Sequence, residues 1–254
     1  MRYLAWIDGR VVEASQLRQD VPYVMQRIHT LGGCVYNANN HLFVLREASE
    51  YLFSFASLIT PSSVERIVAK LLDCAYAPLE CSVPVVMRLY ADGSLSFEVE
   101  APTYGRGAYL RAKRYVGVEI EHSRPLPIMA QCSESCAADA MTERRVYHLG
   151  GDIALWTDAE GNLISLPWRP LFVYYKGVIF TPQEFHSVEY RMASKAIAAA
   201  GYELRVRAIS SSALTMIDEL FMVDVMGVSS LGAARKHRLQ SSVAIRVAKM
   251  MEPK

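Results

Sequence analysis

Two glycine-containing turns near the middle of this 254-residue chain constrain its fold more than any other feature. The first turn, Asp158-Ala-Glu-Gly161, follows an apolar stretch that reads as a strand. The second turn, Lys176-Gly177, joins the apolar residues 171–175 to residues 178–180. Short apolar stretches that are separated by such turns are typical of β-hairpins. The pattern therefore predicts antiparallel strands in the second half of the chain.

The rest of the chain alternates between hairpin and helix signals, which predicts a mixed α/β architecture. Asp8-Gly9 and Asp92-Gly93 each lie between two strand-like stretches. Apolar residues at helical spacing predict a helix over residues 46–59. A capping box, Ser62-Ser-Val-Glu65, predicts the start of a second helix that reaches residue 72. We expect a further helix over residues 135–149.

A proline-containing segment, Ser123-Arg-Pro-Leu-Pro127, has the composition of a linker. It predicts two domains, an N-terminal α/β domain over residues 1–122 and a C-terminal α/β domain over residues 128–254. We expect the last twenty residues to form one amphipathic helix with a basic face. Its apolar side chains are predicted to pack in a dimer or domain interface: Val243, Ala244, Val247 and Met250.

Composition and charge narrow the classes of partner. No apolar run is long enough to span a bilayer, and the net charge of +1 argues against nucleic acid or an acidic membrane as the main partner. The mean hydropathy of +0.12 is slightly apolar, which a buried subunit interface would explain. Five cysteines without a secretory pattern indicate reduced thiols and a cytoplasmic protein.

The order and spacing of several motifs resemble the class IV aminotransferases, the fold type IV pyridoxal phosphate enzymes. This family includes branched-chain and D-amino-acid aminotransferases and aminodeoxychorismate lyase. Its central pattern, G-x-x-x-E-x-x-x-x-N-x-F followed by a hairpin and T-P, matches here at Gly161, Phe172, Gly177, Thr181 and Pro182. Asp218-Glu-Leu-Phe221 matches the family's A-D-E-x-F. The resemblance implies a two-domain class IV aminotransferase-like fold, a homodimer and a substrate cleft between the domains.

The residues that the family uses for its cofactor are missing from the matching positions. The lysine that the resemblance implies would fall within residues 131–133, which read Gln-Cys-Ser, and the glutamate would fall on Ser165. Asp224 stands in the turn where the family binds phosphate, and its carboxylate would oppose a phosphate dianion by about 1 kcal/mol or more. We therefore expect no cofactor. Pyridoxal phosphate with a relocated lysine, Lys113 or Lys195, is the alternative.

Thiol catalysis is one replacement for the missing chemistry. Cys132 lies at the expected lysine position and Cys136 one helical turn further, and a thiolate near a helix N-terminus is a good nucleophile. His148 or Glu134 would then act as the base. The alternative is that both cysteines are small packing residues. The sequence indicates no metal site.

Several aromatic, polar and basic residues are predicted to bind a small molecule in the old cofactor cleft: Tyr36, Arg124, Ser165, Trp168, Arg169, Tyr190 and Arg191. The resulting hypothesis is a biosynthetic enzyme that acts without pyridoxal phosphate on a small organic acid or an amino-acid-derived substrate. The alternatives are a catalytically dead binding subunit and a pyridoxal phosphate enzyme with a relocated lysine.

Overall fold

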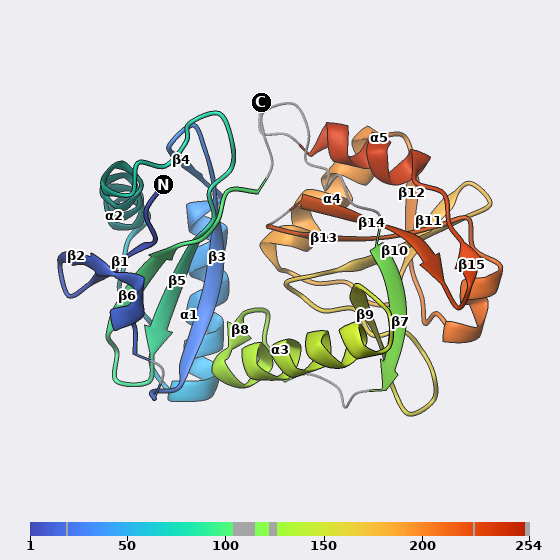
Figure 1. Ribbon diagram of the computed structural model, residues 1–254, viewed down its shortest axis with the longest axis horizontal. Helices are drawn as coiled ribbons and strands as arrows, with labels where there is room; N and C mark the ends of the chain where they lie inside the picture. Colours follow the sequence, from blue (N-terminus) through green and yellow to red (C-terminus); the bar gives the residue numbers. More distant parts are fainter. Residues whose placement is uncertain (19, 104–114, 122–125, 226, 252–254) are drawn as a thin grey trace. The chain divides into compact units, whose positions relative to one another are not determined.

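The computed structural model describes residues 1–18, 20–103, 115–121, 126–225 and 227–251, which form two compact units (Figure 1). Each unit has its own β-sheet, its own helices and its own apolar core. The predicted mixed α/β architecture is therefore confirmed.

Unit 1 is built on a seven-stranded sheet in the order β2-β1-β6-β5-β3-β4, with β8 paired to β3. Its strands are β1 (Leu4–Ile7), β2 (Arg10–Glu13), β3 (Tyr23–Leu31), β4 (Cys34–Tyr36), β5 (Val85–Tyr90), β6 (Leu95–Val99) and β8 (Gln131–Cys132). The turn between β1 and β2 carries positive φ angles at Asp8 (48°) and Gly9 (85°). Such angles match the twist of a tight hairpin, so this predicted hairpin is confirmed, as is the one formed by β5 and β6.

Two helices of unit 1 supply core residues that pack with one face of this sheet: α1 (Ala38–Phe53) and α2 (Pro61–Cys74). α1 begins eight residues before the predicted start and ends where Ser54 adopts a left-handed conformation (φ 61°). α2 begins at Thr60, whose side chain accepts a hydrogen bond from the Ser63 amide at 3.3 Å. The predicted capping box at Ser62 is therefore wrong, because Pro61 already has the fixed φ that suits the first helical position.

Unit 2 is built on an eight-stranded sheet in the order β12-β11-β10-β13-β14-β7-β9, with β15 paired to β14. Its strands are β7 (Tyr115–Glu121), β9 (Ile153–Thr157), β10 (Leu171–Tyr175), β11 (Val178–Thr181), β12 (Glu203–Val206), β13 (Glu219–Asp224), β14 (Gly227–Ala234) and β15 (His237–Arg238). The predicted hairpin of β10 and β11 is confirmed. The turn at Gly161 yields only an isolated bridge between Thr157 and Leu163.

The division between the units differs from the predicted boundary at residues 122–128. β7 pairs in parallel with β14 and β9, so it belongs to the sheet of unit 2. β8 pairs with β3, so residues 128–133 belong to unit 1. A local hydrophobic pattern predicts a strand but does not say which sheet the strand joins.

Unit 2 contains three helices, α3 (Ser133–His148), α4 (Val188–Ala199) and α5 (Ser242–Met250), and a short 3₁₀ helix, η2 (Ser211–Thr215). The predicted twenty-residue tail helix is wrong, because α5 has nine residues and β15 precedes it. Three of its predicted packing residues, Val243, Ala244 and Val247, are buried, whereas Met250 is 48% exposed.

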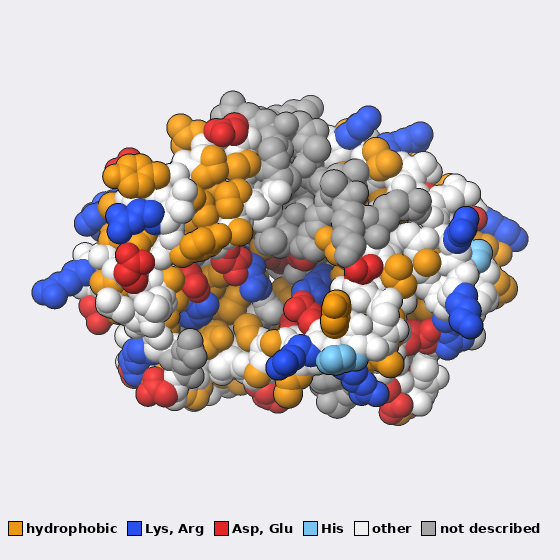
Figure 2. Space-filling model, in the orientation of Figure 1, with side chains coloured by type: hydrophobic (Ala, Val, Ile, Leu, Met, Phe, Trp, Pro, Cys, Tyr) orange, Lys and Arg blue, Asp and Glu red, His pale blue; other side chains and the backbone are white. Residues whose placement is uncertain are grey.

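No helix among the described residues has the length and apolar character needed to cross a bilayer. On the face shown in Figure 2, Lys and Arg side chains are interspersed with Asp and Glu side chains. This face therefore offers no broad patch of a single charge.

Candidate functional site

The segment in which the resemblance implies a lysine forms strand β8 and carries a buried glutamine. Gln131 lies opposite Met25 of β3 and accepts a hydrogen bond from Arg27 Nη1 at 2.5 Å. Nε of Arg27 contacts both carboxylate oxygens of Glu100 at 3.1 and 3.2 Å. A neutral amide, held by an arginine–glutamate pair, therefore occupies this position.

A second arginine lies on the same face of the unit 1 sheet, because Arg88 of β5 is opposite Met25. Arg88 Nη2 donates to Glu98 at 2.6 Å, and its guanidinium lies 5.6 Å from the centre of the Tyr23 ring. Burial acts to lower the pKa of Arg88, but the charge of Glu98 and its hydrogen bond outweigh that effect and raise the pKa.

We call Arg27, Arg88, Glu98, Glu100 and Gln131 the polar face of unit 1. The sequence prediction missed these residues, although alternation was a usable signal. Charged residues at every second position of two strands mark a face that is not part of the apolar core.

The predicted thiol–histidine pair is not brought together. Cys132 follows Gln131 on β8, so its side chain points to the opposite face of the sheet, where it is buried in the apolar core. Cys136 is half-buried on α3, and His148 is exposed at the end of the same helix. Twelve residues separate Cys136 from His148, which corresponds to about 18 Å along the helix axis. That distance is far beyond proton transfer.

In unit 2, residues 165–170 form a loop that connects several predicted site residues. Ser165 is 3% exposed, and its hydroxyl accepts a hydrogen bond from the Leu171 amide at 2.9 Å. Trp168 is buried, and its indole nitrogen donates to Asp139 of α3 at 3.3 Å. Ser165 therefore fixes the start of β10, and Trp168 attaches the loop to α3.

Arg169 of this loop lies between two carboxylates. Its Nε is 3.7 Å from Asp224 at the end of β13, and its Nη2 is 3.9 Å from Glu143 of α3. Two carboxylates beside one guanidinium leave a net negative charge. An anionic ligand is opposed here unless one carboxylate is neutralised or displaced.

The N-terminus of α4 packs on the same loop. Ser187 caps this helix by accepting from the Tyr190 amide at 3.3 Å, and it donates its own hydroxyl proton to the Pro167 carbonyl at 2.5 Å. The Tyr190 ring is buried and lies 6.0 Å from the Phe172 ring in a stacked arrangement. Burial raises the pKa of the Tyr190 hydroxyl.

The structure thus groups four predicted site residues around one loop: Ser165, Trp168, Arg169 and Tyr190. Arg191 is half-buried on α4. Tyr36 is half-buried on β4 of unit 1, opposite His29. Arg124 lies outside the described residues. Within the described part of the chain, no three His, Cys, Asp or Glu side chains are grouped to hold a metal ion.

The described lysines are all exposed side chains of helices or turns: Lys70, Lys176, Lys195, Lys236 and Lys249. Lys113 and Lys254 lie outside the described residues. Hence the described residues do not fit a cofactor that is linked to a lysine within residues 131–133.

Comparison with solved structures identifies the fold. An aminotransferase from Brucella abortus bound to the cofactor PLP superposes with a TM-score of 0.81 at 16% identity, over 99% of this chain and 98% of that one. A branched-chain aminotransferase from Thermoproteus uzoniensis with norvaline gives a TM-score of 0.79 at 18% identity, over 98% and 93% of the two chains. Another branched-chain aminotransferase, from T.th. and with pyridoxamine 5'-phosphate, gives 0.77 at 16% identity, over 98% and 92%. No protein-family model and no curated relative matches the sequence.

These structures correct the prediction that no cofactor is involved. Two of the three hold a vitamin B6 phosphate, which contradicts an expectation based on the missing lysine and glutamate alone. The likeness extends over nearly the whole of each chain, and it includes both units. This chain has the fold of the class IV aminotransferases.

Proposed function

We propose that this protein binds pyridoxal 5'-phosphate or pyridoxamine 5'-phosphate and acts on a small organic acid or an amino-acid-derived substrate. The observation that carries the proposal is the likeness, over 99% of the chain, to an aminotransferase bound to PLP. A biosynthetic role, in a cytoplasmic homodimer, belongs to the same proposal.

The polar face of unit 1 supports an amino-acid-like substrate. It combines two guanidinium groups with two carboxylates, so it can interact with both the carboxylate and the ammonium group of an amino acid. Nη1 of Arg88 is buried and has no hydrogen-bond partner among the described residues. A substrate carboxylate would satisfy this donor.

We further propose that the cofactor is held without a covalent bond. Gln131 cannot form a Schiff base, and it is already held by Arg27 at the implied lysine position. Pyridoxal phosphate supplies an electron-accepting ring when it is bound. On the protein side, Arg169 is the cation nearest to the implied phosphate turn, and Asp224 opposes the phosphate.

Titration with each vitamin B6 phosphate tests the proposal. We expect saturable binding by absorbance and calorimetry, and complete loss of the ligand on dialysis. Asp224→Asn should tighten binding about fivefold to tenfold, since it removes a carboxylate worth about 1 kcal/mol at short range. Glu203→Gln, on an exposed strand of unit 2, is the matched control and should leave affinity unchanged. Absence of binding at millimolar ligand would refute the proposal.

A binding subunit without turnover is the second candidate. The separation of Cys136 from His148 favours it over thiol catalysis, because no base is positioned beside the thiol. Transfer of an amino group between an amino acid and a 2-oxo acid in the presence of pyridoxal phosphate would exclude this candidate.

A further inference from the structure

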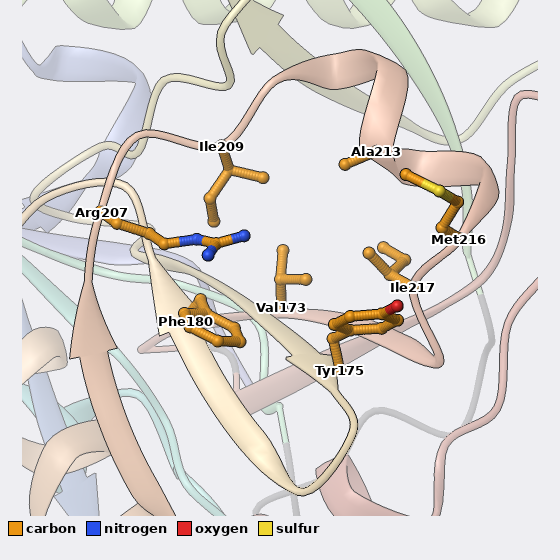
Figure 3. Close-up of a pocket in the computed structure, with 8 residues that line it drawn as sticks. All are labelled: Val173, Tyr175, Phe180, Arg207, Ile209, Ala213, Met216 and Ile217. Carbon is orange, nitrogen blue, oxygen red and sulfur yellow. The ribbon is translucent and has the colours of Figure 1, made fainter.

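A small apolar cavity in unit 2 lies apart from the residues described above. Its volume is about 90 Å³, and it is partly open to solvent. Its lining comes from β10, β11 and the segment that runs from the end of β12 through η2 (Figure 3): Val173, Tyr175, Phe180, Arg207, Ile209, Ala213, Met216 and Ile217. None of these residues belongs to the loop 165–170 or to the polar face of unit 1.

The lining of the cavity is apolar except for one cation and one phenol. Val173 is 2% exposed, and Ile209 and Ile217 are 4% and 5% exposed, so the base of the cavity is part of the apolar core of unit 2. The cavity therefore suits the hydrocarbon part of a ligand.

Arg207 gives the cavity its only charge. Its guanidinium carbon lies 4.4 Å from the centre of the Phe180 ring, and Figure 3 shows the group directed toward the cavity. Among the described residues, no carboxylate forms an ion pair with Arg207, whereas Glu203 holds the neighbouring Arg205 through two hydrogen bonds of 2.7 and 2.9 Å. Arg207 thus retains donors that match a carboxylate in a bidentate geometry.

We propose that this cavity binds a small monocarboxylate with an aliphatic body, such as a short-chain or medium-chain fatty acid. The hydrocarbon would contact Val173, Ile209 and Ile217, while the carboxylate would accept hydrogen bonds from Arg207. A single guanidinium in an otherwise apolar lining matches one negative charge and one apolar chain. This proposal does not depend on the binding of a vitamin B6 phosphate.

Calorimetric titration with octanoate, hexanoate and octan-1-ol tests the proposal. We expect one site per chain for octanoate, weaker binding of hexanoate because less apolar surface is buried, and at least about tenfold weaker binding of the uncharged alcohol. Equal affinities for octanoate and octan-1-ol would overturn the role of Arg207.

Two variants and one control locate the site. Arg207→Gln should weaken octanoate binding about tenfold, and Ala213→Leu, which fills the cavity, should abolish it. Arg205→Gln, which removes the paired neighbour, should leave it unchanged. Thermal unfolding of each variant confirms that the chain is folded. Unchanged binding by Ala213→Leu would overturn the proposal.

Competition separates this site from the proposed cofactor site. We expect the octanoate affinity to be the same with and without saturating pyridoxal phosphate. Displacement of octanoate by pyridoxal phosphate would show that both use one site, which contradicts the inference. Failure of pyridoxal phosphate to bind would leave the octanoate result intact and would count only against the proposed function.

Discussion

Two buried histidines of unit 1 are the most strongly perturbed titratable groups with a clear physical cause. Burial lowers the pKa of His29 to about 4, and burial together with the nearby His29 lowers the pKa of His41 to about 3. The His41 ring is hydrogen-bonded to the Gln26 side chain at 2.9 Å. Both imidazoles are therefore neutral in the folded protein at neutral pH.

This arrangement makes stability depend on pH in a defined direction. The unfolded chain binds protons at these histidines as the pH falls through 6.5, whereas the folded chain does not until about pH 4 and 3. The free energy of unfolding should thus be complete above pH 7 and should fall by about 2 kcal/mol per histidine between pH 7 and pH 5.

Denaturant unfolding at both pH values checks this expectation. His41→Gln keeps a hydrogen-bond donor for Gln26 but cannot titrate, so it should lose about 2 kcal/mol less than the wild type over this pH range. His148→Gln, at an exposed position, should retain the wild-type dependence. An identical pH dependence in His41→Gln and the wild type would contradict the account.

At the scale of elements, a buried carboxylate organises the end of unit 2. Glu219 of β13 is 1% exposed and accepts hydrogen bonds from the Ser242 hydroxyl (2.7 Å) and from the Val243 and Ala244 amides (2.9–3.0 Å). These amides form the first turn of α5, where a negative charge is favoured. The glutamate of the A-D-E-x-F match thus fixes α5 to the sheet.

Glu219→Ala should lower the free energy of unfolding by roughly 2–4 kcal/mol, because it leaves buried amide donors without an acceptor. Asp218→Ala is the matched control. It removes one exposed hydrogen bond from the Lys176 amide and should cost less than about 1 kcal/mol. Equal losses for the two variants in urea unfolding would show that the cap is not a major determinant of stability.

The sequence predicted the elements that are determined locally. The β1–β2, β5–β6 and β10–β11 hairpins follow from turn residues that tolerate positive φ angles, such as Asp8 and Lys176. β14 was not predicted, because its sequence, Gly-Val-Ser-Ser-Leu-Gly-Ala-Ala, contains few residues that favour strands. The placement of β7 and β8 depends on pairing between distant segments.

The site was predictable only in part for the same reason. The loop 165–170 and Tyr190 were selected correctly as neighbours, since the family motif fixes their spacing. The contact between Arg27 and Gln131 joins residues 104 positions apart and leaves no local signal. Cys132 was chosen for its position in the sequence, yet strand alternation directs it into the core.

At the scale of the whole molecule, an aminotransferase fold is kept while the expected lysine position is rebuilt. The solved structures with this fold include examples with PLP and with pyridoxamine 5'-phosphate. In this chain, a glutamine held by an arginine–glutamate pair stands where the resemblance implies the lysine. The central claim is therefore retention of the vitamin B6 phosphate without a covalent bond.

Mass spectrometry after borohydride reduction tests this claim most directly. The wild type and Gln131→Lys are each saturated with pyridoxal phosphate, reduced and digested, and their peptides are compared. The account predicts no pyridoxyl adduct on any lysine of the wild type at stoichiometric yield, and an adduct on the peptide that contains position 131 in Gln131→Lys. A stoichiometric adduct on a native lysine of the wild type, Lys113 included, would contradict it.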